Sequence, residues 1–187
     1  MNTEFSLSRT NEQNFPDKIR SADGKFYRIR ADARTILTIF RLLTDNSVMA
    51  QHKPLLIQRL FFITETPTDG FQLLLDFLGF TGETQNEPQF DYEYDAKEIY
   101  ADFLRYYGID LMNDSIHYKR FVILLANLPS DSALKKKIEL RFADTSKLKG
   151  KEREKMEAEK AKVQLPVYLT REEEKEQAEF IKEWGSV

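Results

Sequence analysis

The amino-acid sequence predicts a mainly α-helical protein: a compact helical domain with a small β-hairpin over residues 1–144, and a charged helical arm over residues 145–187. Apolar residues recur at helical spacing in six segments between Ile36 and Phe142, which favours helices over strands. Aromatic residues become sparse after Asp144, where ten basic and ten acidic residues stand among the last 43. That balance is typical of a solvated helix, so the core is expected before residue 145.

The hairpin and the first helix come from residues 18–43. Asp23-Gly24 is a strong turn signal between two short runs that begin at Lys18 and Phe26, because glycine adopts positive φ at low cost. A lone hairpin is marginal in water and needs a helix to pack on. The next segment supplies an apolar face, with Asp32 as its expected cap: Ile36, Leu37, Ile39, Phe40 and Leu43.

Two further apolar helices are expected between residues 54 and 79. Pro54 suits a first helical turn, and apolar side chains from Leu55 to Ile63 then surround almost the whole helix. Such a helix lies either in the centre of a core or against another subunit. Thr68 or Asp69 opens the next helix, which ends near Gly79.

Three more helices are expected before residue 145. Asp95 and Glu98 have the spacing of a capping box, and Gly108 ends the helix that they begin. Asp114 or Ser115 is the expected start of the second helix, which Pro129 ends, and Asp131 is the expected start of the third.

The arm is expected to contain two helices separated by Pro166. Lys and Glu residues three apart support the first, and Thr170 with Glu173 repeats the capping-box spacing for the second. The second helix presents a narrow apolar stripe of Ala178, Ile181 and Trp184. The stripe is either a docking element for a partner or a surface that folds back onto its own domain.

Composition excludes several kinds of chemistry. The chain has no cysteine, which removes disulfides, thiolate zinc sites and a cysteine nucleophile, and two histidines cannot make a three-histidine metal site. The acidic residues Asp91, Glu93, Asp95, Glu98 and Asp102 match no calcium or magnesium pattern, since capping explains two of them. We therefore expect no metal ion and no cofactor.

Catalytic and nucleic-acid functions also lack a pattern. His117 has no Ser, Cys or second His in a recognisable relation to it, so we expect a packed histidine at a helix start and no enzyme. Lys135–Lys137 and Arg141 form a basic patch, but a net charge of −3 opposes phosphate binding. We expect no nucleic acid and no membrane as partners, and a cytosolic protein, because neither a signal peptide nor a membrane-length apolar run is visible.

A resemblance to a phage family rests on residues between 91 and 144. It is carried by Asp91-Tyr92-Glu93-Tyr94-Asp95, Ile99-Tyr100-Ala101-Asp102-Phe103, Tyr106-Tyr107-Gly108-Ile109-Asp110-Leu111, Phe121, Leu124-Leu125, Leu128, Arg141 and Asp144. The segment resembles the small tail assembly chaperones that siphophages and prophages of Gram-positive bacteria encode upstream of the tape measure protein. His117-Tyr118 stands where that family often has an aromatic pair, commonly tryptophans.

The resemblance implies a chaperone that keeps the tape measure protein soluble in the host cytoplasm until tail tube subunits replace it. It also implies self-association, contact with the tail tube protein and absence from the finished virion. The charged arm either reaches a neighbouring copy, which would produce a ring or filament, or closes on its own subunit. The resemblance transfers no catalytic residues. The alternative is a structural tail or connector subunit that stays in the virion. The apolar side chains expected to bind the partner are Leu56, Leu60, Phe61, Ile63, Phe180, Ile181 and Trp184.

Overall fold

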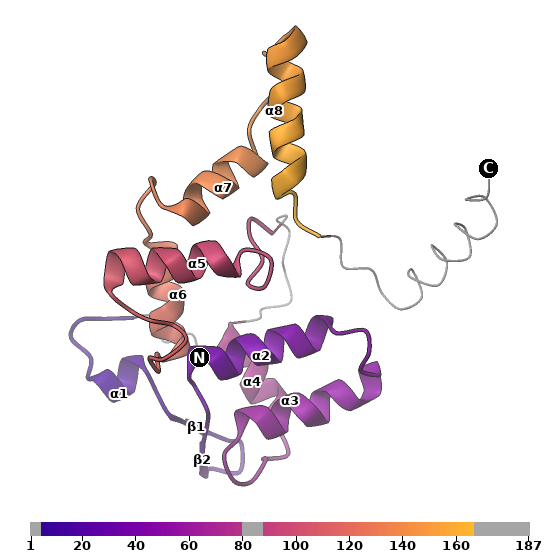
Figure 1. The fold of residues 1–187 in the computed structure, drawn as a ribbon. Coiled ribbons are helices and arrows are strands. Elements are labelled where there is room, and N and C mark those ends of the chain that lie inside the picture. The colour runs from indigo at the N-terminus through magenta and orange to yellow at the C-terminus, as the bar shows by residue number, and fades with distance from the viewer. Residues whose placement is uncertain (1–4, 80–87, 167–187) are drawn as a thin grey trace, which may run out of the picture.

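The computed structural model describes residues 5–79 and 88–166, which form helices around one apolar core (Figure 1). The mainly α-helical prediction is confirmed, including the hairpin near the N-terminus. The helices are α1 (Asn11–Asn14), α2 (Ala33–Thr44), α3 (Lys53–Phe61), α4 (Gly70–Leu78), α5 (Ala96–Asp102), α6 (Tyr118–Ala126), α7 (Ala133–Arg141) and α8 (Gly150–Val163), with a 3₁₀ turn η1 (Ala50–His52) and a π-helical turn η2 (Phe103–Tyr107).

The hairpin consists of β1 (Lys18–Arg20) and β2 (Phe26–Arg28), paired antiparallel with Ile19 opposite Tyr27. Its turn contains Gly24 at φ 85°, as the sequence predicts. The hairpin is fixed to the start of α4, because Ser21 Oγ donates a 2.6 Å hydrogen bond to Asp69 Oδ1 and the Ala22 N–H donates to Asp69 Oδ2.

The segment from Ile29 to Asp32 joins the hairpin to the rest of the fold through backbone hydrogen bonds on both sides. The Arg30 N–H donates to the Phe61 carbonyl at 2.7 Å, and the Tyr118 N–H donates to the Ala31 carbonyl at 2.7 Å. The Arg30 guanidinium also donates to three carbonyls at the end of α3, those of Arg59, Leu60 and Phe62. This segment therefore ties the C-terminal end of α3 to the N-terminal end of α6.

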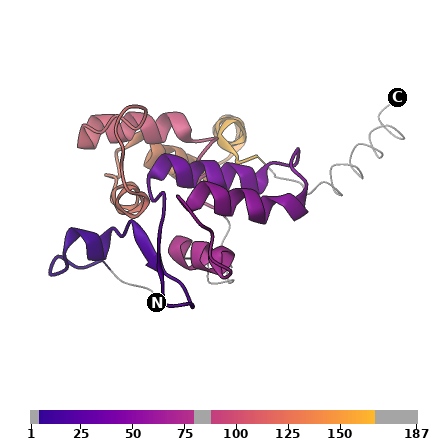
Figure 2. The same ribbon diagram turned by 90° about the horizontal axis from the view of Figure 1, so that it is seen from below.

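The helix α2 starts where the sequence predicts, because Asp32 Oδ1 accepts the Thr35 N–H at 2.9 Å. Its apolar face supplies fully buried Ile36 and Ile39 to the core. Viewed from below, α2 and α3 lie side by side with α4 against α3 (Figure 2). The remaining core comes from every major helix before α8: Ile57, Phe61, Phe62, Leu74, Phe77, Ile99, Phe103, Phe121, Leu125 and Leu134.

Two predicted helix starts need correction. The sixth helix, α6, begins after His117 rather than at Asp114 or Ser115. The Nδ1 atom of the His117 ring accepts the Lys119 N–H and so caps this helix. The seventh begins after Ser132, whose Oγ accepts the Lys135 N–H, rather than at Asp131. In both places several residues with capping side chains follow one another, and tertiary contacts select among them.

The π-helical turn η2 continues α5 and ends at Gly108, which has φ 65° and closes the helix as predicted. Phe103 in this turn stacks on Phe121 of α6 with ring centroids 4.9 Å apart. Tyr107 Oη donates to the Leu124 carbonyl at 2.8 Å. The wider turn thus fits one face of η2 onto α6.

The helix α8 is the charged helix that the sequence predicts after residue 146, and it projects away from the helices of the core (Figure 1). Lys162 pairs with Glu159 at 2.8 Å as expected, whereas Glu157 pairs with Arg153 instead of Lys160. The Lys160 ammonium donates to the Ala143 carbonyl, which attaches α8 to the end of α7.

Candidate partner-binding groove

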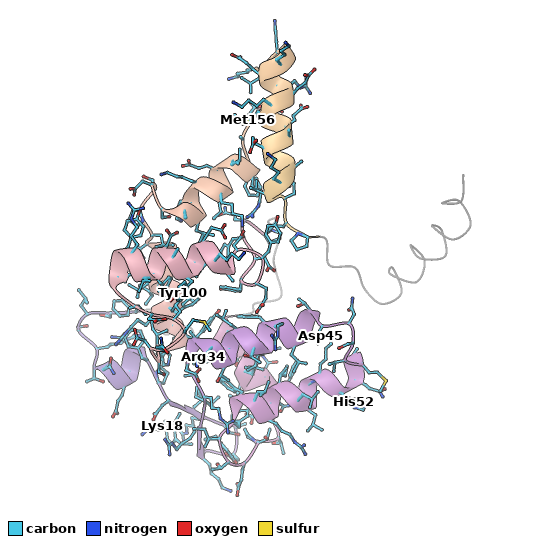
Figure 3. The ribbon with its side chains drawn as sticks, viewed as in Figure 1. Lys18, Arg34, Asp45, His52, Tyr100 and Met156 are labelled. Atoms are coloured by element: carbon cyan, nitrogen blue, oxygen red, sulfur yellow. The ribbon has the colours of Figure 1, made fainter. Side chains whose placement is uncertain are left out.

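A groove of about 500 Å³ lies between α2, the N-terminal part of α5 and the loop of residues 111–116. Arg34 on α2 and Tyr100 on α5 lie on its two facing sides (Figure 3). Its walls combine an apolar floor with charged and polar edges: Asp32, Ala33, Arg34, Leu37, Thr38, Arg41, Tyr92, Glu93, Ala96, Ile99, Tyr100, Leu111, Met112, Asn113, Asp114, Ser115, Ile116 and Phe121.

The floor of the groove belongs to the core and is therefore fixed in shape. Ile99, Ile116 and Phe121 are buried, and Phe121 lies 6.1 Å from Tyr92 between ring centroids. Phe40 stacks on the other side of Tyr92 at 5.5 Å. Burial raises the pKa of Tyr92, so the phenol is neutral at physiological pH. The result is a preformed apolar surface of the kind that accepts a ligand without rearrangement.

One end of the groove is closed by the loop after Gly108. Asp110 Oδ1 accepts the Met112 N–H at 2.9 Å, and Asp114 Oδ2 accepts the Asp110 N–H at 2.8 Å. Arg34 then donates to the Met112 carbonyl at 2.6 Å. These bonds hold the Met112 side chain at the rim, where 69% of the residue is exposed.

The exposed charges at the rim are basic on α2 and acidic elsewhere, while Asp32, which caps α2, also lines the groove. Arg34 and Arg41 are exposed on α2, seven residues and two helical turns apart. Glu93 is exposed on the other side, just before α5. A peptide helix with segregated charges would therefore fit in one orientation better than in the other.

Behind the groove, buried charges join α5 to α7 and α8. Arg141 donates to both carboxylate oxygens of Asp95, at 2.9 and 3.2 Å, and Lys137 lies 2.8 Å from Asp95 and 3.1 Å from Glu98. The Arg141 Nε–H also donates to the Val163 carbonyl at 2.7 Å. Asp95 and Arg141 are both almost completely buried.

This ion network corrects two sequence-based interpretations. The Asp95 side chain does not cap α5, because both of its oxygens face Arg141 and Lys137. Lys137 and Arg141 do not form an exposed basic patch with Lys135 and Lys136, because both pair with Asp95. Burial by itself would raise the pKa of Asp95, but hydrogen bonds from Arg141, Lys137 and the Asp91 N–H outweigh it and lower the pKa. The carboxylate is therefore charged in the folded protein.

A second buried carboxylate, that of Asp102, caps a helix other than its own. Its two oxygens accept the N–H groups of Ala133 and Leu134, each at 2.9 Å, at the first turn of α7. Negative charge is favoured at that position by the helix dipole. Asp102 and the pair of Asp95 with Arg141 thus fix α7 at both ends relative to α5.

His117 has the structural role that the sequence predicts. Its Nδ1 accepts the Lys119 N–H at 3.1 Å, and its Nε2 lies 3.1 Å from the Pro16 carbonyl, which accepts from it. The ring contacts Phe15 at 5.4 Å and Phe77 at 6.1 Å between centroids. Burial lowers the pKa of His117 despite the Pro16 hydrogen bond, so the ring is neutral at pH 7.

The residues that the sequence suggests for partner binding do not lie in the groove. Leu56 on α3 is 38% exposed, Leu60 is half-buried, and Ile63, after the helix, is 37% exposed. Phe61 is fully buried and belongs to the core. The expected helix through Ile63 is too long, since the chain leaves α3 at Phe62, which bridges to Ile29. Phe180, Ile181 and Trp184 lie outside the described residues.

The sequence does not predict the groove, because its lining joins residues 32–41, around the start of α2, to segments that begin about 50 residues or more later, at Tyr92 and Leu111. One signal for it was available. Leu111 and Met112 are apolar residues within a polar run of Asp110, Asn113 and Asp114, and an apolar pair in such a loop favours an exposed contact surface.

Within the described residues, no group of three or more His, Asp and Glu side chains is arranged to hold a metal ion. None of the described helices combines the length and the apolar character needed to cross a membrane.

Comparison with known proteins concerns the part of the chain that contains α5 to α8. Residues 78–165 match the family of the Bacteriophage Gp15 protein. The match covers just under half of the chain and includes the ion network and the loop at the closed end of the groove. It confirms the resemblance to a bacteriophage protein family. No curated protein and no solved structure is significantly similar to the chain.

Proposed function

We propose that this protein is a tail assembly chaperone that binds the phage tape measure protein and keeps it soluble while the tail is built. The observation that carries the proposal is the preformed apolar groove between α2 and α5, in a chain that is similar to a bacteriophage family. The proposal places the protein in the host cytoplasm, outside the mature virion, with no enzymatic activity and no cofactor.

The groove suits one face of an amphipathic helix. Apolar side chains of such a helix would cover Leu37, Ile99 and Met112, while its polar edges would meet Arg34 or Arg41 on one side and Glu93 on the other. A long helical client offers this face repeatedly along its length. Many copies with modest individual affinity can then cover the client and still be displaced by tail tube subunits.

Self-association is the second part of the proposal, and α3 offers a surface for it. Leu55 and Leu56 on α3 are 53% and 38% exposed, and neither of them lines the groove. Contacts between copies through this face would leave the groove open to the client. Head-to-tail contacts of this kind produce rings or filaments.

Co-expression with the tape measure protein of the same phage tests the proposal. The unaltered chain is expected to raise the soluble fraction of the tape measure protein and to co-purify with it. Met112→Glu is expected to lower the co-purified amount about tenfold, since burying a methionine side chain contributes about 1.5–3 kcal/mol. Met49→Glu is the matched control, because Met49 is 49% exposed and outside the groove.

Two results would contradict the proposal. If neither protein changes the solubility of the other and the two do not co-purify, the chaperone function fails. If mass spectrometry of purified virions finds the chain in stoichiometric amounts, the alternative function, a structural tail or connector subunit, replaces it.

A further inference from the structure

The outward face of the hairpin gathers positive charge beside an exposed aromatic ring. Lys18 lies opposite Arg28 and Arg20 lies opposite Phe26, and all four side chains belong to the same face of the two strands. All four residues are exposed, and Phe26 is 64% exposed. The hairpin lies at the end of the molecule opposite α8, and none of the four residues lines the groove (Figure 1). This face is therefore a second surface, separate from the groove.

The positive charge of this face is not paired within the described part of the chain. The acidic residue of the turn, Asp23, is held by other groups, because its carboxylate accepts the Lys25 N–H and the Tyr27 hydroxyl, each at 2.9 Å. Tyr27 belongs to the opposite face, where its ring contacts Phe62 at 6.3 Å between centroids. The ion pairs between described residues include none with a basic residue of the outward face.

The strand β1 also leaves one edge of the small sheet open. At one end of the ladder, the Ile29 N–H donates to the Asp17 carbonyl at 2.8 Å. Hydrogen-bonded and non-bonded pairs alternate along an antiparallel ladder, so Lys18 and Arg20 direct their N–H and C=O groups away from β2. No described residue forms a hydrogen bond with these four backbone groups. They are available to a further strand.

Protection of the open edge explains only part of this pattern. Basic side chains on an edge strand prevent pairing with the same edge of another copy, and Lys18 and Arg20 meet that need. Arg28 and Phe26 belong to β2, whose other edge is covered, because the Ile63 N–H donates to the Arg28 carbonyl at 3.1 Å. Arg28 also lies directly opposite Lys18, and like charges in that position lower the stability of a strand pair. A binding role accounts for both residues.

We propose that the hairpin binds an extended acidic segment of another protein, which adds a strand to the open edge of β1. The backbone groups of Lys18 and Arg20 form its hydrogen bonds, and acidic side chains at alternate positions of the segment lie beside these two residues. Arg28 and Phe26 contact longer side chains that reach across β1. A peptide suits this edge better than nucleic acid, because a phosphate backbone only accepts hydrogen bonds and leaves the two carbonyls unmatched.

Fluorescence anisotropy with a labelled peptide tests the proposal on the full chain. The probe alternates Glu with Thr, and a control peptide has the same composition arranged as one Glu block and one Thr block. We expect the alternating peptide to bind about tenfold more tightly than the block peptide, since only the alternating peptide places every acidic side chain on one face of a strand.

A charge reversal locates the binding site. Arg20→Glu is expected to weaken binding of the alternating peptide on the order of tenfold, because an attractive charge becomes a repulsive one. Lys151→Glu is the matched control: Lys151 is exposed on α8, and its replacement changes the net charge of the chain by the same amount. This control is expected to bind as the unaltered chain does.

A comparison of Lys18→Pro with Lys18→Ala measures the contribution of the backbone edge. Both variants lose the positive charge, but only proline removes the N–H at the open edge, which takes no part in the pairing with β2. We expect the proline variant to bind about fivefold more weakly than the alanine variant, as for the loss of one hydrogen bond. Thermal unfolding verifies that both variants are folded.

Four outcomes overturn the proposal. Equal binding of the two peptides means that charge decides without a strand, and unchanged binding in Arg20→Glu means that the peptide binds elsewhere. No binding at about 1 mM peptide means that there is no such site. Tighter binding of a single-stranded oligonucleotide than of the peptide assigns the face to nucleic acid.

The probe peptide is not the tape measure protein, so a failure here is separate from a failure of the chaperone function. Met112→Glu, which alters the groove, is expected to leave peptide binding unchanged. A loss of peptide binding in this variant would place the peptide in the groove and would also overturn the proposal.

Discussion

Residues 18–78 are held together mainly by apolar contacts, whereas residues 88–163 add buried charges to apolar contacts such as those of Phe103 and Phe121. In the first region, Ile36, Ile57 and Leu74 are fully buried, and its hydrogen bonds hold the hairpin and the helix ends. In the second region, the contacts between α5, α7 and α8 depend on Asp95, Arg141 and other charged groups with little exposure to water. The family match falls almost entirely on this second region.

The difference indicates which region tolerates substitutions and which region depends on particular residues. Apolar contacts accept many residues of similar volume, whereas a buried ion pair is strongly unfavourable when one partner is removed. The second region also holds the point at which the chain leaves α8, through Val163. The geometry of this region therefore determines where the chain continues after α8.

The largest expected effect comes from breaking the ion pair. Arg141→Met leaves the Asp95 carboxylate buried without its bidentate partner, and we expect the free energy of unfolding to fall by about 3–5 kcal/mol. Urea denaturation followed by circular dichroism measures the change. In the double variant Asp95→Leu with Arg141→Met, part of this loss is expected to be recovered, since the unpaired carboxylate is gone while the Val163 carbonyl still lacks its donor. A loss below about 1 kcal/mol in the single variant would show that the pair is not essential.

A cavity in the first region has a somewhat smaller expected effect. Leu74→Ala removes a fully buried side chain, which costs about 2–4 kcal/mol in urea denaturation. Unlike the ion pair, this site has no second residue whose substitution would restore stability. A loss below about 1 kcal/mol would mean that α3 and α4 close the cavity by moving together.

The smallest effect concerns His117, a residue of the second region whose ring contacts Phe77 of the first. Because its pKa is lowered in the folded protein, the unfolded chain binds the proton more readily, and stability is lost as the pH falls below 6.5. His117→Asn keeps a capping side chain, costs about 1 kcal/mol at pH 8, and should remove the loss of stability between pH 7 and pH 5. Thermal unfolding across this range measures it. His52→Asn is the control and should still lose stability between pH 7 and pH 5. If the two variants lose the same amount of stability over this range, His117 is not the source of the pH dependence.

The elements of this fold follow largely from local patterns in the sequence. The hairpin depends on Asp23-Gly24, the start of α2 on Asp32, and the ends of α4 and η2 on Gly79 and Gly108, which all act within a few residues. The errors arise where distant residues decide. The helix α3 ends early because Phe62 pairs with Ile29, a contact across more than 30 residues.

The candidate site was less accessible to sequence reasoning. The capping interpretation of Asp95 is locally sound, since Glu98 has the right spacing, but Arg141 lies 46 residues away and competes for the same carboxylate. The groove requires α2, α5 and the loop of residues 111–116 to be placed together, which no local pattern specifies. The apolar stripe of Ala178, Ile181 and Trp184 is predicted from helical periodicity alone and lies outside the described residues.

The π-helical turn η2 has a consequence for how the chain tolerates changes in length. Such a turn accommodates one more residue than an α-helical turn, so deleting a single residue within Phe103–Tyr107 would leave a regular helix. It would also rotate Asp102 by about 100° relative to Gly108, away from the first turn of α7 that it caps. The extra residue thus sets the angular register between α5 and the chain that follows Gly108, and natural length variation is expected to avoid it.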